Sequence, residues 1–174
     1  NIIFKNALTL IDESCKEIRT VSHSMMPNAL LKAGLDSALK EFLLQIDNKI
    51  INLNIYTEGL EKRLDAETET VLYRVIQESV NNVLKHSQAS FIHLTEHDVE
   101  DKVIIRLHHD GKGLTQEEFL RFTKEKDGLG LKNIQSRLRV LYGDIMYEED
   151  ASQSLYKVTI EIPREEGEEN FSSK

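Results

Sequence analysis

Residues 77–87 have the sequence QESVNNVLKHS, which contains neither glycine nor proline. With about 100° of rotation per residue, a helix here gathers its reactive side chains within one arc and its apolar side chains on the opposite side. The reactive face consists of Glu78, Asn82, Lys85 and His86. Asn81 and Asn82 each cost roughly 0.5 kcal/mol relative to a good helix former, which favours a functional face. A solvated polar surface is the alternative.

The side chains of this face complement one another chemically. A carboxylate such as that of Glu78 can take a proton, and the amide oxygen of Asn82 can ligate Mg²⁺. Lysine and histidine side chains at positions 85 and 86 can contact phosphate oxygens. The helix therefore carries the groups that a phosphate-binding site uses.

The surrounding pattern predicts an α/β two-layer sandwich in which a mixed sheet packs on helices. Asp65 is the expected N-cap of a helix over 66–86, with Glu69 as a first-turn carboxylate. The other predicted elements are a helix over 35–46, a strand over 51–55, a hairpin of strands 91–97 and 103–107, a helix over 130–142, and strands over 145–150 and 155–162. This order favours the sandwich over a doubly wound parallel sheet.

A glycine-containing segment, HDGKGL at 109–114, follows the second strand of the predicted hairpin. Asp110 supplies a hydrogen-bond acceptor for an exocyclic amine, and Gly111 and Gly113 allow a flat ligand to approach the backbone. An ordinary turn is the alternative. His108 and His109 are expected to be surface residues at the strand end, and residues 115–127 are expected to form a loop or lid.

A second glycine pair opens the helix that follows the predicted lid. Gly128, Leu129 and Gly130 stand at its start, where free N–H groups and the positive end of the helix dipole suit a phosphate. A helix start that merely contains glycine is the alternative.

The N-terminal segment contains a heptad pattern. Apolar or small residues recur at alternating steps of four and three along residues 3–26, namely Phe4, Leu8, Ile11, Cys15, Ile18, Ser22 and Met25. This pattern predicts a helix that dimerises through the seam, the alternative being an amphipathic helix packed on its own domain. Pro27 stops or kinks this helix, and residues 27–34 are expected to be the joint to the next unit.

Composition excludes several classes of protein. The 174 residues carry 22 Lys and Arg against 30 Asp and Glu, and the net charge of −8 disfavours nucleic-acid binding. The single cysteine cannot form an internal disulfide, and no Cys/His cluster has zinc-ligand spacing. No apolar run approaches the roughly 20 residues of a membrane span, so a cytoplasmic chain is expected, with any membrane contact made through segments outside it.

Taken together, these segments resemble the ATP-binding catalytic domain of the GHKL superfamily, which has the Bergerat fold. Within it, they are most similar to sensor histidine kinases of the nitrate-sensor and desaturase-sensor type. Residues 77–87 resemble the N box of that family, 109–114 its first glycine box and 128–131 its second. Upstream, residues 17–27 resemble the end of the second dimerisation helix of the same kinases.

The resemblance implies a role for each site residue. Asn82 would coordinate Mg²⁺ that bridges the ATP phosphates, with Lys85 and His86 beside the phosphates. Asp110 would recognise the adenine amino group, and Glu78 would act as the general base. The remaining implied nucleotide contacts are Gly111, Gly113, Gly128, Leu129 and Gly130.

The resemblance also implies partners and a domain division. Phosphate would pass from ATP to a histidine outside this chain, because His23 lies just before Pro27 and lacks a following acidic residue. It would then pass to an aspartate of a response regulator, within a full-length homodimer. The expected division is a truncated dimerisation helix over 1–27, a catalytic domain over 28–163 and a disordered acidic tail over 164–174.

Three other functions share parts of the pattern. A serine kinase of the anti-sigma type would have the same ATP site, although the heptad helix and the Lys85–His86 pair argue against it. A dimerisation module with a vestigial nucleotide pocket is a non-enzymatic alternative, against which Glu78, Asn82 and Asp110 weigh. Relatives of gyrase and chaperone ATPases usually need long transducer domains.

Overall fold

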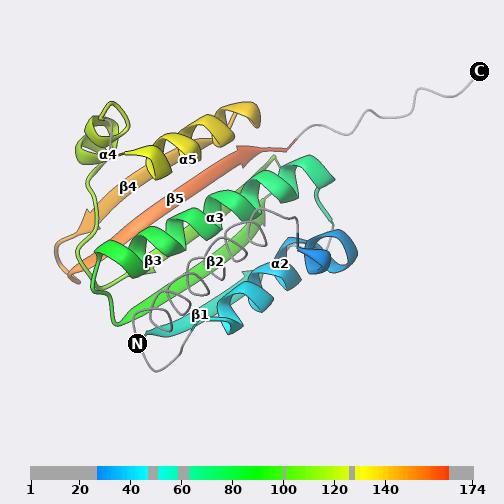
Figure 1. Ribbon diagram of the computed structural model, residues 1–174, viewed down its shortest axis with the longest axis horizontal. Helices are drawn as coiled ribbons and strands as arrows, with labels where there is room; N and C mark the ends of the chain where they lie inside the picture. Colours follow the sequence, from blue (N-terminus) through cyan, green and yellow to red (C-terminus); the bar gives the residue numbers. More distant parts are fainter. Residues whose placement is uncertain (1–26, 47–50, 59–62, 100, 126–127, 165–174) are drawn as a thin grey trace, which may run out of the picture.

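The computed structural model describes residues 27–46, 51–58, 63–99, 101–125 and 128–164. These residues form a two-layer sandwich in which helices cover one face of a five-stranded sheet (Figure 1). The elements are α2 (Asn28–Leu44), β1 (Asn52–Glu58), α3 (Ala66–His86), β2 (Phe91–Val99), β3 (Lys102–His109), α4 (Gln116–Phe122), α5 (Leu129–Val140), β4 (Asp144–Asp150) and β5 (Leu155–Pro163). The predicted α/β two-layer fold is confirmed.

The sheet is mixed, as expected, and its strand order is β1-β2-β3-β5-β4. Strand β1 pairs with β2 in parallel, whereas the other three pairs are antiparallel. The predicted hairpin is the β2–β3 pair, and both of its strands run longer than the sequence pattern indicates. Strand β5 lies between β3 and β4, so the last strand of the chain is an interior strand of the sheet (Figure 1).

Helix α3 has the predicted bounds and the predicted cap. One Asp65 carboxylate oxygen accepts hydrogen bonds from the backbone N–H groups of Glu67 at 3.0 Å and Thr68 at 2.9 Å. These bonds satisfy two of the free donors of the first turn. The apolar side of the helix packs on the sheet and is almost fully buried, as at Leu72 and Val80. Burial of this side turns the opposite, reactive side toward α5, which α3 contacts.

The expected joint over 27–34 is instead the first part of α2, which begins directly after Pro27. A proline at this position suits a helix start, because the helix needs no hydrogen bond from its nitrogen there. The helix is kinked at Gly34, where φ is +87°. A Cβ at that position would lie 2.9 Å from the Arg63 side chain. The absence of a side chain at Gly34 therefore leaves room for the Arg63 side chain.

Arg63 ties α2 to α3. Its guanidinium donates to both carboxylate oxygens of Glu69, at 2.8 and 2.6 Å, and to the carbonyl oxygen of Leu30 at 3.1 Å. Glu69 is only 3% exposed, so this paired arrangement is the one in which its charge can be buried. The predicted first-turn carboxylate thus joins two helices in addition to standing near the start of α3.

The expectation of a loop over 115–127 is wrong at its centre, where α4 forms. Thr115 and Glu118 make a capping box: Glu118 N–H donates to Thr115 Oγ1 at 3.3 Å, and Thr115 N–H donates to Glu118 Oε2 at 2.9 Å. Phe119, which is 1% exposed, anchors the helix by stacking on Tyr147 of β4 at 4.6 Å between ring centroids. Two anchors thus make a short helix stable here.

Several predictions concern residues outside the described ranges. They are the seam helix over 3–26 with Cys15 and His23, and the tail, of which only Arg164 is described. Within the described part of the chain, no helix is both long enough and apolar enough to span a bilayer.

The burial of Glu96 leads us to expect an unusual dependence of the free energy of unfolding on pH. Its side chain is 0% exposed on β2, and neither carboxylate oxygen has a hydrogen-bond partner among the described residues. Burial, with a further contribution from Asp36, raises the pKa of Glu96 to about 8, against the opposing charge of Lys40 on α2. The folded state therefore binds the Glu96 proton more tightly than the unfolded state does.

We expect this contribution to stability to be complete below the unfolded pKa near 4.5 and to be lost as pH rises to about 8. The loss is about 1.4 kcal/mol per pH unit. Glu96→Gln should flatten this slope in urea unfolding between pH 5.5 and 7.5, whereas Glu117→Gln, an exposed control on α4, should retain it. Equal slopes in the two variants would contradict the prediction.

Candidate functional site

A cavity of about 530 Å³ lies between the reactive side of α3, the loop after β3, α4, the start of α5 and the ends of β4 and β5. Its lining residues are Ser79, Asn82, Val83 and His86 of α3; Ser87; His109, Lys112, Gly113 and Leu114 at the end of β3 and in the loop; Glu118, Phe122 and Glu125 in and after α4; Gly128, Gly130 and Leu131 at the start of α5; and Tyr147, Tyr156, Lys157 and Val158 of β4 and β5. All three predicted site segments contribute to it.

The cavity has an apolar floor and a charged rim. The floor consists of buried side chains from the sheet and α3, including Val83, Tyr147 and Val158. The rim carries the exposed side chains of His86 and Lys112. A ligand that combines a flat apolar ring with an anionic group matches this division.

Two of the four predicted α3 residues line the cavity, namely Asn82 and His86. The Asn82 amide nitrogen is buried and has no hydrogen-bond partner among the described residues. Its amide oxygen lies toward α5, 3.6 Å from the place that a Cβ at Gly130 would take. Lys85 is exposed and does not line the cavity.

Glu78 is not a lining residue, but it stands directly behind the rim. A Cβ on Gly130 would overlap the Glu78 carboxylate, so the two residues are in close approach. The amide of Asn82 lies beside the same glycine. The first turn of α5 therefore faces both the carboxylate and the amide that the sequence singled out.

The start of α5 offers free backbone donors to the cavity. Gly128 is the N-cap of this 12-residue helix and makes no side-chain cap bond. Gly128 and Gly130 both line the cavity, whereas Leu129 is 66% exposed and does not. Free N–H groups at a helix start, together with the helix dipole, attract anions.

Asp110 does not occupy the predicted position. Its Oδ1 accepts from the backbone N–H groups of Ser90 at 2.8 Å and Phe91 at 3.2 Å, and its Oδ2 accepts from the Ser90 hydroxyl at 2.5 Å. Burial opposes its ionisation, but these hydrogen bonds prevail and lower the pKa of Asp110. The carboxylate thus holds the start of β2 and is absent from the cavity lining.

His109 lines the cavity in its place, so the expectation that it is a surface residue is wrong. The side chain is 3% exposed, and its ring stacks on Tyr156 with centroids 5.7 Å apart and an interplanar angle of 17°. The Nδ1 atom is buried and has no hydrogen-bond partner in the described structure. His109 is therefore a polar group set into the floor.

The two glycines of this loop have different roles. A Cβ on Gly111 would overlap the Ser87 carbonyl oxygen and lie 2.6 Å from the Ala89 nitrogen, so Gly111 packs against the α3–β2 connection and does not line the cavity. Gly113 does line it, and a Cβ there would lie 2.5 Å from Tyr156 Cβ and closer still to the ring. Only Gly113 adjoins the ligand space.

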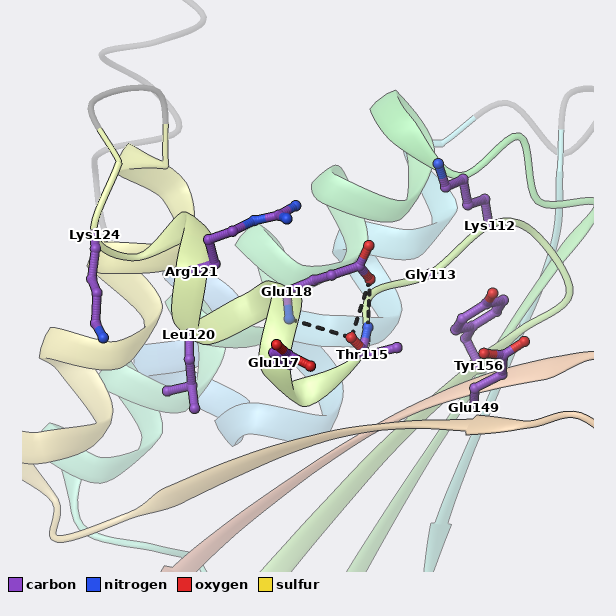
Figure 2. A pocket seen from close by; sticks show the side chains of 10 residues that line it. All are labelled: Lys112, Gly113, Thr115, Glu117, Glu118, Leu120, Arg121, Lys124, Glu149 and Tyr156. Atoms are coloured by element: carbon purple, nitrogen blue, oxygen red, sulfur yellow. Dashed lines mark hydrogen bonds between the residues drawn. The ribbon is translucent and has the colours of Figure 1, made fainter.

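A second hollow of about 690 Å³ adjoins the first on the outer side of α4 (Figure 2). The residues common to both hollows are Lys112, Gly113, Glu118 and Tyr156. In Figure 2 the Glu118 carboxylate points toward Thr115, its capping-box partner. The remaining lining mixes both signs of charge, as in Arg121 and Glu149. This hollow extends the rim of the first cavity.

The sequence patterns did not single out several polar or aromatic residues of the cavity. They include His109, Lys112, Tyr147, Tyr156 and Lys157. Burial raises the pKa of Tyr147, so its hydroxyl stays protonated. Together these side chains provide two of the aromatic rings and two of the cations of the site.

Comparison with known proteins gives consistent results. Residues 67–166 match the family described as Histidine kinase-, DNA gyrase B-, and HSP90-like ATPase. The chain is 30% identical over 145 residues to sensor histidine kinase ComP of Bacillus subtilis, an alignment that covers 83% of this chain and 18% of the relative. It is 29% identical over 148 residues to oxygen sensor histidine kinase NreB of Staphylococcus carnosus, with 84% of this chain and 41% of the relative covered.

A solved structure shows the same fold. Histidine kinase AdeS of Acinetobacter baumannii superposes with a TM-score of 0.60 at 20% identity, over 94% of this chain and 85% of that chain. The chain spans less than half the length of ComP and of NreB. These findings match the resemblance that residues 77–87, 109–114 and 128–131 indicate.

Proposed function

Because the chain belongs to the family of histidine kinase-, DNA gyrase B- and HSP90-like ATPases, we propose that it is the ATP-binding catalytic core of a sensor histidine kinase. The observation that carries the proposal is the cavity that joins the reactive side of α3 to the first turn of α5 above an apolar floor. The purine would lie on the floor, and the phosphates would lie at the rim beside Asn82, His86 and the N–H groups of α5. Lys112 adds a cation that the sequence pattern did not indicate.

The donors at the rim fit a magnesium ion held jointly with phosphates. Mg²⁺ in phosphate sites usually takes one or two protein oxygens together with phosphate oxygens and water. The Asn82 amide oxygen lies beside Gly130 at the start of α5 and can supply such an oxygen. Bound magnesium would neutralise phosphate charge and orient the γ-phosphate. The buried, unpartnered Asn82 nitrogen supports a polar ligand at this place.

Glu78 is the proposed general base. The imidazole nitrogen of an acceptor histidine attacks the γ-phosphorus, the bond from phosphorus to the bridging oxygen breaks, and ADP leaves. The proton of the imidazole passes to the Glu78 carboxylate. The close approach of Glu78 to the first turn of α5 supports this role, because the phosphates would lie at the same turn.

The partners follow from the same proposal. The acceptor histidine lies outside this chain, and the phosphate then passes to an aspartate of a response regulator. In this proposal, residues 28–163 are the catalytic domain of a full-length cytoplasmic homodimer. The similarity to two sensor histidine kinases supports this assignment.

The test is transfer of radiolabelled γ-phosphate from ATP to a separately purified first dimerisation helix of the same kinase. We expect an acid-labile, base-stable product. Glu78→Gln should lower the transfer rate by about 100-fold or more, because a positioned base contributes that much, without changing the affinity for ADP. Glu67→Gln, an exposed control at the other end of α3, should leave the rate unchanged.

Two results would overturn the proposal. An acid-stable phosphoserine product would indicate a serine kinase. A folded chain that binds ATP and yields no phosphohistidine would indicate a nucleotide-binding module without kinase activity.

A further inference from the structure

We propose that His109, not Asp110, contacts the base of the bound nucleotide, and that its imidazole lets the cavity accept 6-oxo purines as well as 6-amino purines. This inference rests on the proposed function, because it concerns the base in the same cavity. It goes further by assigning a residue and a substrate class to the floor of the site.

Position within the cavity indicates that the base lies against His109. The rim holds His86, Lys112 and the start of α5, which are the groups that attract phosphate. The buried part of the lining includes Val83 and Val158, which suit an aromatic ring system. A nucleotide with its phosphates at the rim therefore places its base on the floor, where His109 lies.

The polar groups of the floor differ in whether they already have a hydrogen-bond partner within the protein. The Ser79 hydroxyl donates to the Val75 carbonyl oxygen at 2.9 Å, so its proton is already used within α3. His109 Nδ1 has no partner in the described structure, although it is fully removed from solvent. A buried ring nitrogen without a hydrogen bond is unfavourable, and a ligand that supplies one removes the penalty. His109 Nδ1 can therefore form a hydrogen bond with a ligand without giving up one within the described structure.

The chemistry of imidazole determines which bases can serve. Burial lowers the pKa of His109, the negative charge of Asp110 opposes this, and His108 adds to it. A neutral imidazole has one donor and one acceptor nitrogen and can exchange them between its two tautomers. It can therefore accept from the 6-amino group of adenine or donate to the 6-oxo group of hypoxanthine.

A carboxylate at this position would behave differently. An ionised carboxylate only accepts hydrogen bonds, so it favours the 6-amino group and repels the 6-oxo oxygen. Asp110 cannot supply this discrimination, because both of its oxygens are bonded to Ser90 and Phe91 outside the cavity. The floor therefore lacks the feature that would exclude a 6-oxo purine.

The experiment compares dissociation constants for ADP and inosine diphosphate by displacement of a fluorescent nucleotide. Inosine diphosphate lacks a 2-amino group, so the comparison isolates the exchange of 6-amino for 6-oxo and its effect on the N1 proton. We expect the wild-type constants to agree within about tenfold, roughly the net contribution of one hydrogen bond. His109→Asp should raise the preference for ADP by about tenfold or more.

Two variants serve as controls. His108→Asn changes the neighbouring residue, which alternates to the opposite face of β3 and lies near His93, with ring centroids 6.3 Å apart. It should leave both constants unchanged. Tyr147→Phe removes the hydroxyl of another ring that lines the cavity and should leave the ratio of the constants unchanged.

Each outcome decides the matter. A wild-type preference for ADP above about tenfold overturns the inference, and so does a ratio that changes in Tyr147→Phe but not in His109→Asp. The wild-type ratio needs no variant, so the inference stays falsifiable if His109→Asp does not fold. Binding of neither nucleotide by the folded wild-type chain overturns the proposed function itself.

Discussion

Asn82→Ala is expected to lower the rate of phosphoryl transfer by at least about 100-fold, comparable to the loss of one fixed electrostatic contact in a transition state. Asn82 lines the cavity, and its amide oxygen lies beside the first turn of α5. Alanine removes both the proposed magnesium ligand and the buried amide nitrogen that has no partner in the described structure. Because that nitrogen is unpaired, its removal leaves no protein group newly unsatisfied, and folding should change little.

Asn81→Ala is the matched control, since it changes the neighbouring asparagine on the same helix but not the cavity lining. Single-turnover transfer to the separate acceptor helix should distinguish the two variants, with ADP affinity measured with and without magnesium. We expect only Asn82→Ala to lose the magnesium dependence of binding. Equal rates for the two variants would exclude Asn82 as the metal ligand.

Gly113→Ala should weaken ADP binding by about tenfold or more, since overpacking a filled site typically costs 1–3 kcal/mol. A Cβ at this position would lie 2.5 Å from Tyr156 Cβ and closer still to the ring. The ring cannot easily yield, because it stacks on His109 across the floor. Either the ring enters the ligand space or the loop moves away from β5, and both changes alter the cavity.

Calorimetry with ADP tests this prediction, together with a double variant. Gly113→Ala combined with Tyr156→Ala removes the overlap and should recover part of the lost affinity for ADP, so the effects of the two substitutions are expected to be non-additive. Gly143→Ala is the control: its Cβ would lie 3.0 Å from the Glu161 carbonyl oxygen, and Gly143 does not line the cavity. It should leave ADP affinity unchanged. Additive effects of the Gly113 and Tyr156 substitutions would contradict the proposed overlap.

Local patterns predicted the elements that carry the site. Helix α3 followed from one periodic face and from the Asp65 cap, and both features depend on residues close in sequence. The short α4 could also have been predicted, because Thr115 and Glu118 have the spacing of a capping box. The parallel pairing of β1 with β2 could not, since it joins strands separated by the whole of α3.

The glycine-containing segment shows how a motif can draw attention to one residue when its neighbour lines the cavity: His109 lines it and Asp110 does not. Along β3, Val103, Ile105 and Leu107 alternate toward the helices, and the same period of two continues to His109. This alternation indicates an inward histidine, whereas the adjacent glycines draw attention to the aspartate. The bonds from Asp110 to Ser90 and Phe91 join residues about twenty positions apart, so no local pattern reveals them.

The position of β5 between β3 and β4 has a consequence for synthesis on the ribosome. Tyr156 and Val158 complete the floor, and β4 joins the sheet only through β5. While residues up to Asp150 are emerging, β3 has an open edge, and the cavity lacks one wall. A nucleotide can stabilise only a chain that has formed its binding site. A nascent chain therefore gains no stabilisation from a nucleotide until Pro163 has left the exit tunnel, and until then the open edge of β3 can pair with other chains.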